Sequence, residues 1–243
     1  MNHGQNQFSV RLLAIGALLA IAPMQAAWAG PAPRPKAPAL GHAAPFALLG
    51  GSAVTCTGGA IIGNVGISSP GTADDFANTG CVITGKVSPA TDAAADAAKQ
   101  DFTRTYDALL LRAPSCIVQT GTLAGVTLAP GVYCIDAAVT GTLTLDGPPK
   151  GVWIFLTTGA LTGTDFIVTM AGGGQACHVW WAPGDGLTMT TSALQGNILA
   201  GDLGDGSITL TGGTLVGRAL ADIAVTTTGT DVTVPAKGKG CPK

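Results

Sequence analysis

Pairs of threonines separated by one residue recur along the sequence. Residues two apart in an extended strand point to the same side, so each pair presents two hydroxyl groups together. Threonine is stiff at χ1, its hydroxyl can anchor a water molecule, and its methyl group favours a cage of ordered water. On stacked strands such pairs would form a grid of about 4.8 Å by about 7 Å. We therefore predict a water-ordering surface carried by Thr142, Thr144, Thr188, Thr190, Thr209, Thr211, Thr226 and Thr228.

Threonine is also a favourable exposed residue in any strand, and the sequence does not say which pairs share a face. The other residue types that could do chemistry are poorly placed for it. Asp74 with Asp75, and Asp202 with Asp205, lie beside glycines as ordinary turn residues do. Arg218 stands alone in an apolar stretch and is expected to donate structural hydrogen bonds. The sequence therefore predicts no catalytic residues and no cofactor.

The composition excludes one large class of partners. The net charge is -2 and only 11% of residues are charged, so the chain lacks the basic face that nucleic acid requires. It is 47% hydrophobic, which predicts a packed core rather than a disordered linker. With 36 glycines, no glutamate and abundant threonine and valine, most of the chain should be strand and turn.

The first residues have the pattern of a secretory signal peptide. Arg11 ends a short polar region, residues 12–21 are apolar, and residues 27–29 form a small-x-small cleavage site. We expect residues 1–29 to be removed, since about ten apolar residues are too few to span a bilayer. Residues 30–45 are rich in proline and alanine and should form an extended tether before a single domain at 46–243.

All six cysteines follow the expected signal peptide, as in proteins of an oxidising compartment. Six cysteines allow fifteen disulfide arrangements, of which local pairing is the simplest. It would join Cys56 to Cys81, Cys116 to Cys134 and Cys177 to Cys241. A metal site is not expected, because no CxxC spacing occurs and the three histidines are scattered.

One segment has a helical pattern. From about residue 89 to 112 the chain lacks glycine, and apolar residues recur at steps of three and four. The expected apolar stripe consists of Ala94, Ala97, Ala98, Phe102, Tyr106, Leu109 and Leu110. Such a stripe must pack against another element, and the surrounding sequence is typical of β-structure.

The remainder alternates short strands with glycine turns. We expect strands at residues 60–67, 125–135, 141–145, 152–156, 166–170, 179–182, 187–190, 208–211 and 223–227. Trp180 and Trp181 are adjacent, so one should face the core and the other outward. The irregular spacing of the threonine pairs favours a β-solenoid, while a β-sandwich remains the alternative on pattern alone.

An ordered series of motifs resembles the secreted ice-binding (antifreeze) proteins of bacteria, fungi and algae. It begins with FALLGGSAVT at residues 46–55 and IGNVGISSPGT at 62–72. The series continues with TYDA at 105–108, LAPGVY at 128–133, GTLTLD at 141–146, WIF at 153–155, QACHVWW at 175–181 and GRALA at 217–221. The resemblance covers residues 45–235.

The resemblance implies a right-handed, three-sided, discontinuous β-helix with one α-helix along a side. It also implies that the protein adsorbs to ice through a flat threonine-rich face and slows ice growth and recrystallisation. We accordingly expect a secreted monomer whose partner is ice or ordered water, with no membrane contact after signal cleavage. The alternative is an adhesive or structural β-helix module, secreted or attached to a surface by its tether, without ice activity.

Overall fold

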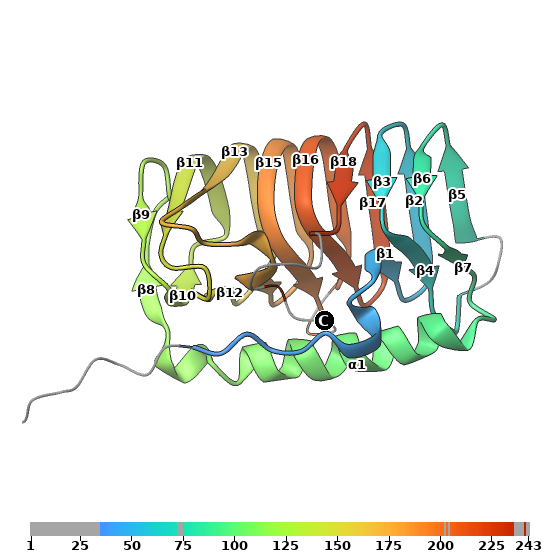
Figure 1. The fold of residues 1–243 in the computed structure, drawn as a ribbon, viewed down its shortest axis with the longest axis horizontal. Coiled ribbons are helices and arrows are strands. Elements are labelled where there is room, and N and C mark those ends of the chain that lie inside the picture. Colours follow the sequence, from blue (N-terminus) through green and yellow to red (C-terminus); the bar gives the residue numbers. More distant parts are fainter. Residues whose placement is uncertain (1–34, 72–74, 202, 204, 236–240, 242–243) are drawn as a thin grey trace, which may run out of the picture. The chain divides into compact units, whose positions relative to one another are not determined.

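Parallel strands stacked coil upon coil make up most of the structure (Figure 1). The computed structural model describes residues 35–71, 75–201, 203, 205–235 and 241. The expected signal peptide, Asp74 and Asp202 lie outside the described residues. The prediction of a single domain from residue 46 is compatible with one compact unit that spans residues 34–243.

The strands pair in three parallel ladders. The threonine ladder contains β5 (Phe76–Thr79), β2 (Ala53–Thr57), β17 (Ala224–Thr228) and the first parts of β16 (Ile208–Ala221), β15 (Leu187–Ala200), β13 (Leu161–Ala171) and β11 (Ala138–Asp146). The mixed ladder contains β6 (Val82–Thr84), β3 (Ala60–Ile62), β18 (Asp231–Thr233), later parts of β16, β15, β13 and β11, and β9 (Thr127–Leu128).

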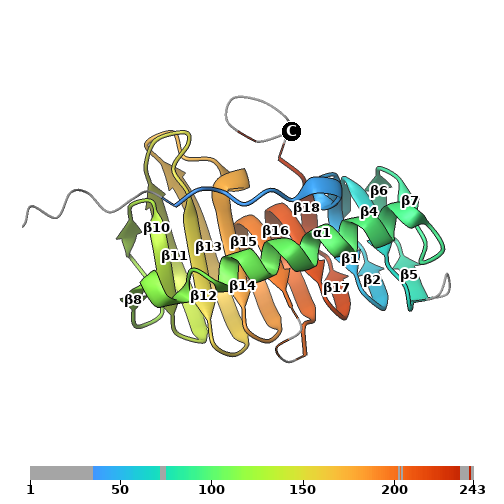
Figure 2. The same ribbon diagram turned by 90° about the horizontal axis from the view of Figure 1, so that it is seen from below.

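The helix-covered ladder lies beneath the α-helix (Figure 2). It contains β7 (Val87–Ser88), β4 (Asn64–Ile67), β1 (Phe46–Gly50), the ends of β16 and β15, β14 (Val179–Pro183), β12 (Trp153–Thr157), β10 (Gly131–Ile135) and β8 (Ile117–Gln119). The expected strands from residue 141 to 227 all overlap these elements, and those at 152–156 and 223–227 begin one residue before β12 and β17. The expected strands at 60–67 and 125–135 each divide into two, β3 with β4 and β9 with β10. The sequence missed β1, β2 and β18 as well as β5 to β8. β1 is buried throughout and shows no alternation, and β5 to β8 are short terminal strands that are largely exposed.

The order of the coils does not follow the order of the chain. The first strands, β1, β2 and β3, pair with the last ones, β16, β17 and β18. After β7 the chain enters the α-helix, which carries it along the stack to β8 at the opposite end (Figure 1). Coils distant in sequence thus become neighbours, which is the discontinuity that the resemblance implies.

An apolar core fills the interior of the coils. Its centre is an aromatic column in which Phe155 stacks on Trp181 at 4.1 Å and on Tyr133 at 5.7 Å, between ring centroids. Phe166 packs edge-on against Trp181. Offset or edge contacts of this kind add to the hydrophobic gain from burial. The core therefore supports the ladders from inside with large, rigid side chains.

Helix α1 (Ala93–Leu110) is shorter at both ends than the predicted helix at 89–112. Asp92 is extended and its side chain accepts a hydrogen bond from the backbone N–H of Ala94, so it caps the helix. After α1 the chain enters the short 3-10 helix η3 (Ala113–Ser115). Ala98, Phe102, Tyr106 and Leu109 are buried as expected, whereas Ala94 is exposed and Ala95 is buried in its place.

A second apolar cluster joins α1 to the ladder beneath it. Phe102, Tyr106 and Leu109 pack with Trp180, Leu199, Leu220 and their neighbours. The Tyr106 hydroxyl donates a hydrogen bond to the carbonyl of Pro183 at 2.8 Å. Trp181 lies in the interior and Trp180 faces the other way, as predicted, but the helix covers Trp180 and it is not exposed.

Residues 35–45 differ from the extended tether that the sequence predicted. Leu40 and Ala43 are buried against α1, and residues 41–43 form the 3-10 helix η1 (Gly41–Ala43). The Thr105 hydroxyl donates to the carbonyl of Ala39, and Asp101 accepts from the backbone N–H of His42. Proline and alanine composition misled the prediction, because these small residues fit closely beside a helix. We call residues 35–45 the strap.

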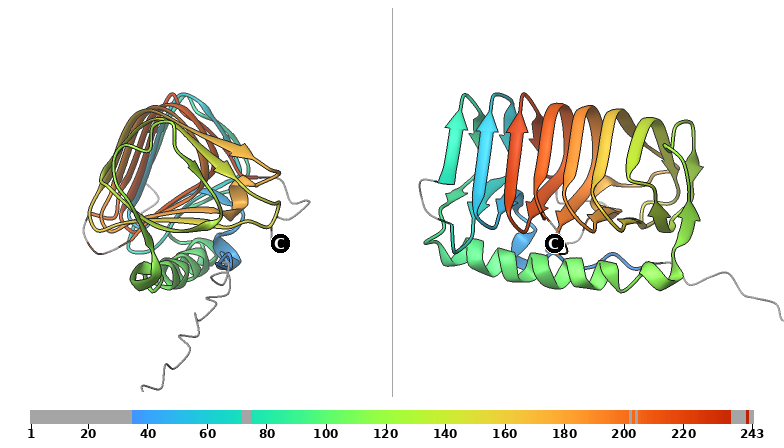
Figure 3. Two further views of the ribbon diagram at one scale, coloured as in Figure 1. Left: turned by 90° about the vertical axis from the view of Figure 1, so that its left-hand side faces the viewer. Right: turned by 180° about the vertical axis from the view of Figure 1, so that it is seen from behind.

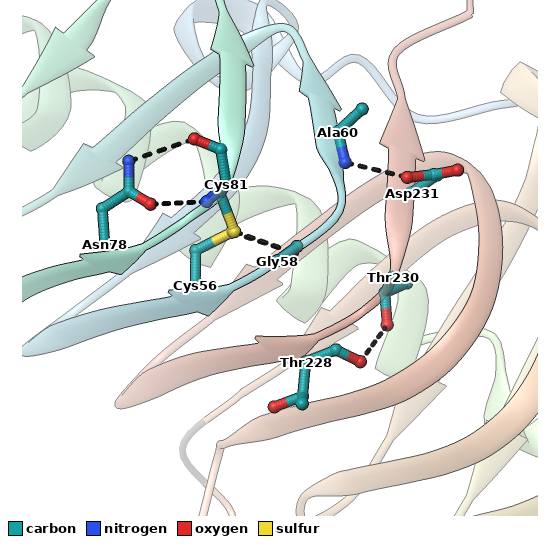
Figure 4. The surroundings of a disulfide bond; sticks show 8 residues. All are labelled: Cys56, Gly58, Ala60, Asn78, Cys81, Thr228, Thr230 and Asp231. Carbon is teal, nitrogen blue, oxygen red and sulfur yellow. Dashed lines mark hydrogen bonds between the residues drawn. A yellow bond between two sulfur atoms is a disulfide. The ribbon is translucent and has the colours of Figure 1, made fainter.

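The structure contains the three disulfides that local pairing suggested: Cys56–Cys81, Cys116–Cys134 and Cys177–Cys241. The Cys56–Cys81 disulfide joins β2 of the threonine ladder to the outermost coil (Figure 4). The Cys116–Cys134 disulfide joins β10 to the chain just before β8. All six cysteines are paired. Mass analysis of the non-reduced protein should accordingly detect no free thiol, and labelling of any cysteine would contradict these pairings.

Thr227 is an inward residue with an unsatisfied hydroxyl. It is fully buried between Leu210 and Cys56 in register, and its Oγ1 has no hydrogen-bond partner. Valine has the same shape without the polar atom, so Thr227→Val should stabilise the protein by about 1 kcal/mol. Denaturant unfolding with disulfides intact would measure the gain. The exposed neighbour Thr228→Val is the control and should change stability by less than about 0.5 kcal/mol.

Candidate functional site

The outward residues of the threonine ladder form two columns. One column runs, in register, through Ala77, Thr55, Thr226, Thr209, Thr188, Thr162 and Ala138. The other runs through Thr79, Thr57, Thr228, Thr211, Thr190, Thr164 and Thr140. At about 4.8 Å per strand, each column is roughly 29 Å long. The ladder thus repeats a threonine-x-threonine pattern on every coil between its two ends.

Six predicted residues belong to this surface: Thr188, Thr190, Thr209, Thr211, Thr226 and Thr228. The sequence missed Thr55, Thr57, Thr79, Thr140, Thr162 and Thr164. Thr162–Gly163–Thr164 has the same spacing, but its central glycine hides the apolar alternation. Thr55 and Thr57 lie far from the others in the sequence, and only the pairing of β2 with β17 brings them into the columns.

The hydroxyls at the centre of the two columns are free to bind water. In the described part of the chain, no hydrogen bond engages the side-chain oxygens of Thr188, Thr190, Thr209, Thr211, Thr226 and Thr228. Toward the β11 end the protein itself uses hydroxyls, because Thr140 donates to the carbonyl of Thr164 and Thr162 to that of Ala137. Thr55 and Thr57 on β2 are free in the same way, so the water-binding capacity of the ladder is greatest over β15, β16, β17 and β2.

Thr142 and Thr144 lie on the mixed ladder, apart from the other predicted threonines. Thr144 and Thr169 are in register and their hydroxyls bond to each other at 3.1 Å. Farther along, the outward positions of this ladder hold Ile167, Ala193, Gln195, Val216 and Asp231 between the threonines Thr127, Thr214 and Thr233. This surface thus interrupts its threonines with larger apolar and amide side chains and carries a charge, unlike the threonine ladder.

A corner separates the two ladders directly after the second threonine column. The residue there has a left-handed backbone on each coil, and on five coils it is glycine: Gly80, Gly58, Gly229, Gly212 and Gly141. The other two are Asp165 and Thr191, with φ of 51° and 47°. The Thr191 hydroxyl donates to the carboxylate of Asp165, which offsets part of the backbone cost. These corners end the threonine surface along one straight edge.

The threonine ladder is hollowed at its β11 end, where Ala138 has only a methyl group and Gly163 has no side chain. Ala138 is exposed and lies beside Thr162 in the first column, so Ala138→Thr would extend that column by one coil. We expect a measurable rise in thermal hysteresis with a stability change below about 0.5 kcal/mol. The matched control is Ala193→Thr on the mixed ladder, which should leave hysteresis unchanged; an equal gain from both variants would contradict the assignment of the face.

Among the described residues, no group of three or more histidine, cysteine or acidic side chains could hold a metal ion. The backbone N–H of Asp205 donates to the carboxylate of Asp185, and the Asp205 carboxylate accepts from the hydroxyl of Ser207. Within the same described ranges, no helix is long and apolar enough to cross a membrane.

A parallel β-helix with an exposed, uncharged threonine surface is the class of protein that this arrangement defines. The sequence profile of the ice-binding-like family matches residues 48–233, and the chain belongs to this family. An ice-binding protein of Nostoc sp. (strain HG1) is 34% identical over 200 residues, which cover 79% of this chain and 72% of that protein.

Solved structures agree with this membership. An ice-binding protein from an Antarctic biological consortium has a TM-score of 0.73 and 32% identity, with 84% of this chain and 94% of that chain covered. One from the Antarctic ascomycete Antarctomyces psychrotrophicus has a TM-score of 0.70 and 30% identity, covering 83% of this chain and 100% of that one. These relatives lend no support to the alternative of an adhesive module.

Proposed function

We propose that this protein binds ice through the threonine ladder and has no enzymatic activity. The observation that carries the proposal is the pair of threonine columns whose central hydroxyls are free, together with the family membership. The face is rigid because β-branched side chains have few rotamers and the strands beneath rest on the aromatic core. It is uncharged, so ordered water above it is not disturbed by a strongly hydrated ion.

We infer further that the coils wind as a right-handed, three-sided solenoid. The three ladders and the outline seen along the stack support three sides (Figure 3). Parallel strands joined through a crossover in one sheet are right-handed in nearly every known case. On this geometry the threonine ladder is one flat side, and α1 occupies another, which leaves the threonines accessible.

The proposed mechanism is adsorption. Hydroxyl groups spaced about 4.8 Å by about 7 Å hold water molecules near ice-like positions, and the methyl groups between them order the remaining water. A bound molecule then joins the ice front and pins it. Growth can continue only between pinned points, where the front becomes curved, so further growth needs a lower temperature. Recrystallisation slows for the same reason.

We propose that the protein acts outside the cell as a monomer. Three disulfides suit an oxidising compartment, and the amino-terminal pattern of the sequence is that of a cleaved signal. A single continuous face is sufficient for adsorption, so no second copy is needed.

Nanolitre osmometry of the purified mature protein tests the proposal. We expect thermal hysteresis, faceted ice crystals and inhibition of recrystallisation. A folded protein at high concentration with none of these three activities would contradict ice binding.

A further inference from the structure

Two buried hydroxyl side chains lie at the corner that ends the second threonine column. Each follows the left-handed corner residue: Ser192 comes after Thr191 on β15, and Thr230 comes after Gly229 between β17 and β18. Ser192 is 4% exposed and Thr230 is 2% exposed. Neither can touch ice, so any influence on ice binding must pass through the residues that they contact.

Ser192 bonds to two coils at once. Its hydroxyl donates to the carbonyl of Thr190, in the second column, at 2.9 Å. The same oxygen accepts from the backbone N–H of Phe166, on the neighbouring coil of β13, at 3.2 Å. Ser192 thus ties the backbone of one column threonine to the next coil.

Thr230 occupies the same corner position two coils away. Its hydroxyl lies 3.4 Å from the carbonyl of Thr228, which also belongs to the second column (Figure 4). It lies 3.2 Å from the carbonyl of Gly212, on the neighbouring coil of β16. One hydroxyl hydrogen can serve both acceptors in a bifurcated bond. Thr230 therefore connects a column threonine to the next coil, as Ser192 does.

The coils beside these two carry glycine at the same corner position. They are Gly213 on β16 and Gly59 just before β3. A Cβ at Gly213 would clash with the carbonyl oxygen of Ser192, and one at Gly59 with that of Thr230. The backbones of neighbouring coils are thus in direct contact, and a shift of a hydroxyl-bearing corner would be passed on to the glycine corner beside it.

Other cross-links continue along this corner toward β5. The carboxylate of Asp231 accepts a hydrogen bond from the backbone N–H of Ala60 at 2.8 Å, which joins β18 to β3 (Figure 4). The Cys56–Cys81 disulfide joins the last two coils. The second threonine column is therefore bordered by bonds or close contacts between coils from β5 to β13.

We propose that Ser192 and Thr230 are positioning residues for ice binding, because their hydrogen bonds hold the second threonine column in line. The inference rests on the proposed function. Threonines can order water in an ice-like pattern only while their spacing is fixed. The corner residues that follow them, Thr191 and Gly229, have positive φ, which is costly for threonine and easily changed for glycine. A buried hydroxyl bonded to the preceding carbonyl restrains both corners.

Threonine methyl NMR of the secreted chain tests this positioning without ice. In Ser192→Ala the methyl resonance of Thr190 should shift and broaden, while that of Thr188, in the first column of the same strand, should change little. In Thr230→Val, which keeps the shape of the side chain, the resonance of Thr228 should respond in the same way.

Thermal hysteresis is the second readout. The double variant Ser192→Ala/Thr230→Val should lose about half or more of its hysteresis, since a recognition surface whose support is loose by about 1 Å no longer fits its target. Tyr106→Phe is the matched control, because it removes one buried hydroxyl bond, to the carbonyl of Pro183, on the helix-covered side. It should lower the melting temperature but leave hysteresis and the column methyls unchanged.

Thr230→Ser retains the hydroxyl and should keep the hysteresis that Thr230→Val reduces. Full hysteresis in the double variant, unchanged column methyls, or an equal loss of hysteresis in Tyr106→Phe would overturn the proposal. A wild-type chain without hysteresis would contradict ice binding instead, and the methyl resonances would still decide whether the two hydroxyls hold the column.

Discussion

Thr209→Tyr should remove most of the thermal hysteresis while the protein remains folded. Thr209 lies in register between Thr188 and Thr226, near the middle of the first threonine column. A tyrosine ring there would project above the surrounding threonines and hold ice away from them. Its stability cost should stay below about 0.5 kcal/mol, because Thr209 points outward and makes no side-chain hydrogen bond in the described structure.

Thr226→Tyr, one coil farther along the same column, should have the same effect. Nanolitre osmometry would measure the loss, and circular dichroism with thermal melting would establish that both variants fold. Thr142→Tyr is the matched control, since Thr142 is an exposed threonine on the mixed ladder. Full hysteresis in both ladder variants, together with a loss in Thr142→Tyr, would move the ice-binding face to the mixed ladder.

Trp181→Ala should lower the free energy of unfolding by about 3–5 kcal/mol. Trp181 is 1% exposed and contacts Phe155 face to face and Phe166 edge to face. Its indole N–H donates to the carbonyl of Gln195. Alanine would leave a large cavity in the aromatic column and an unsatisfied carbonyl, and the neighbouring rings can move only a little to fill the space.

Urea or guanidinium unfolding with the disulfides intact would measure this loss. Trp181→Phe is the control, because it retains a ring on Phe155 and loses mainly the hydrogen bond, so its cost should be about 1–3 kcal/mol. A cost below about 1 kcal/mol for alanine would show that the column is not packed as described. Near the freezing point the variant should still be folded and retain its hysteresis, which separates stability from ice contact.

The local patterns in the sequence predicted the helix and most of the long strands, and the simplest of the possible disulfide arrangements is the one in the structure. The alanine-rich segment without glycine predicted α1, because an amphipathic helix of eighteen residues is determined by its own spacing and caps. Strict alternation predicted the threonine-bearing parts of β15 and β16 for the same local reason. Cysteine pairs close in sequence were correct because adjacent coils keep such residues near each other.

Only the tertiary structure decided which threonines share a face. The sequence offered Thr142 and Thr144 as candidates beside the others without saying which pairs share a face, because alternation reports which side of a strand is outward but not which ladder the strand joins. Thr55 and Thr57 entered the columns through the pairing of β2 with β17, across nearly the whole length of the chain. Register between coils depends on the lengths of the loops and on the core packing beneath. By itself, the sequence determined the family, the helix and the outward side of the strands that it predicted. The stacking of coils determined the surface that the threonines make, because that surface is built from contacts between distant segments.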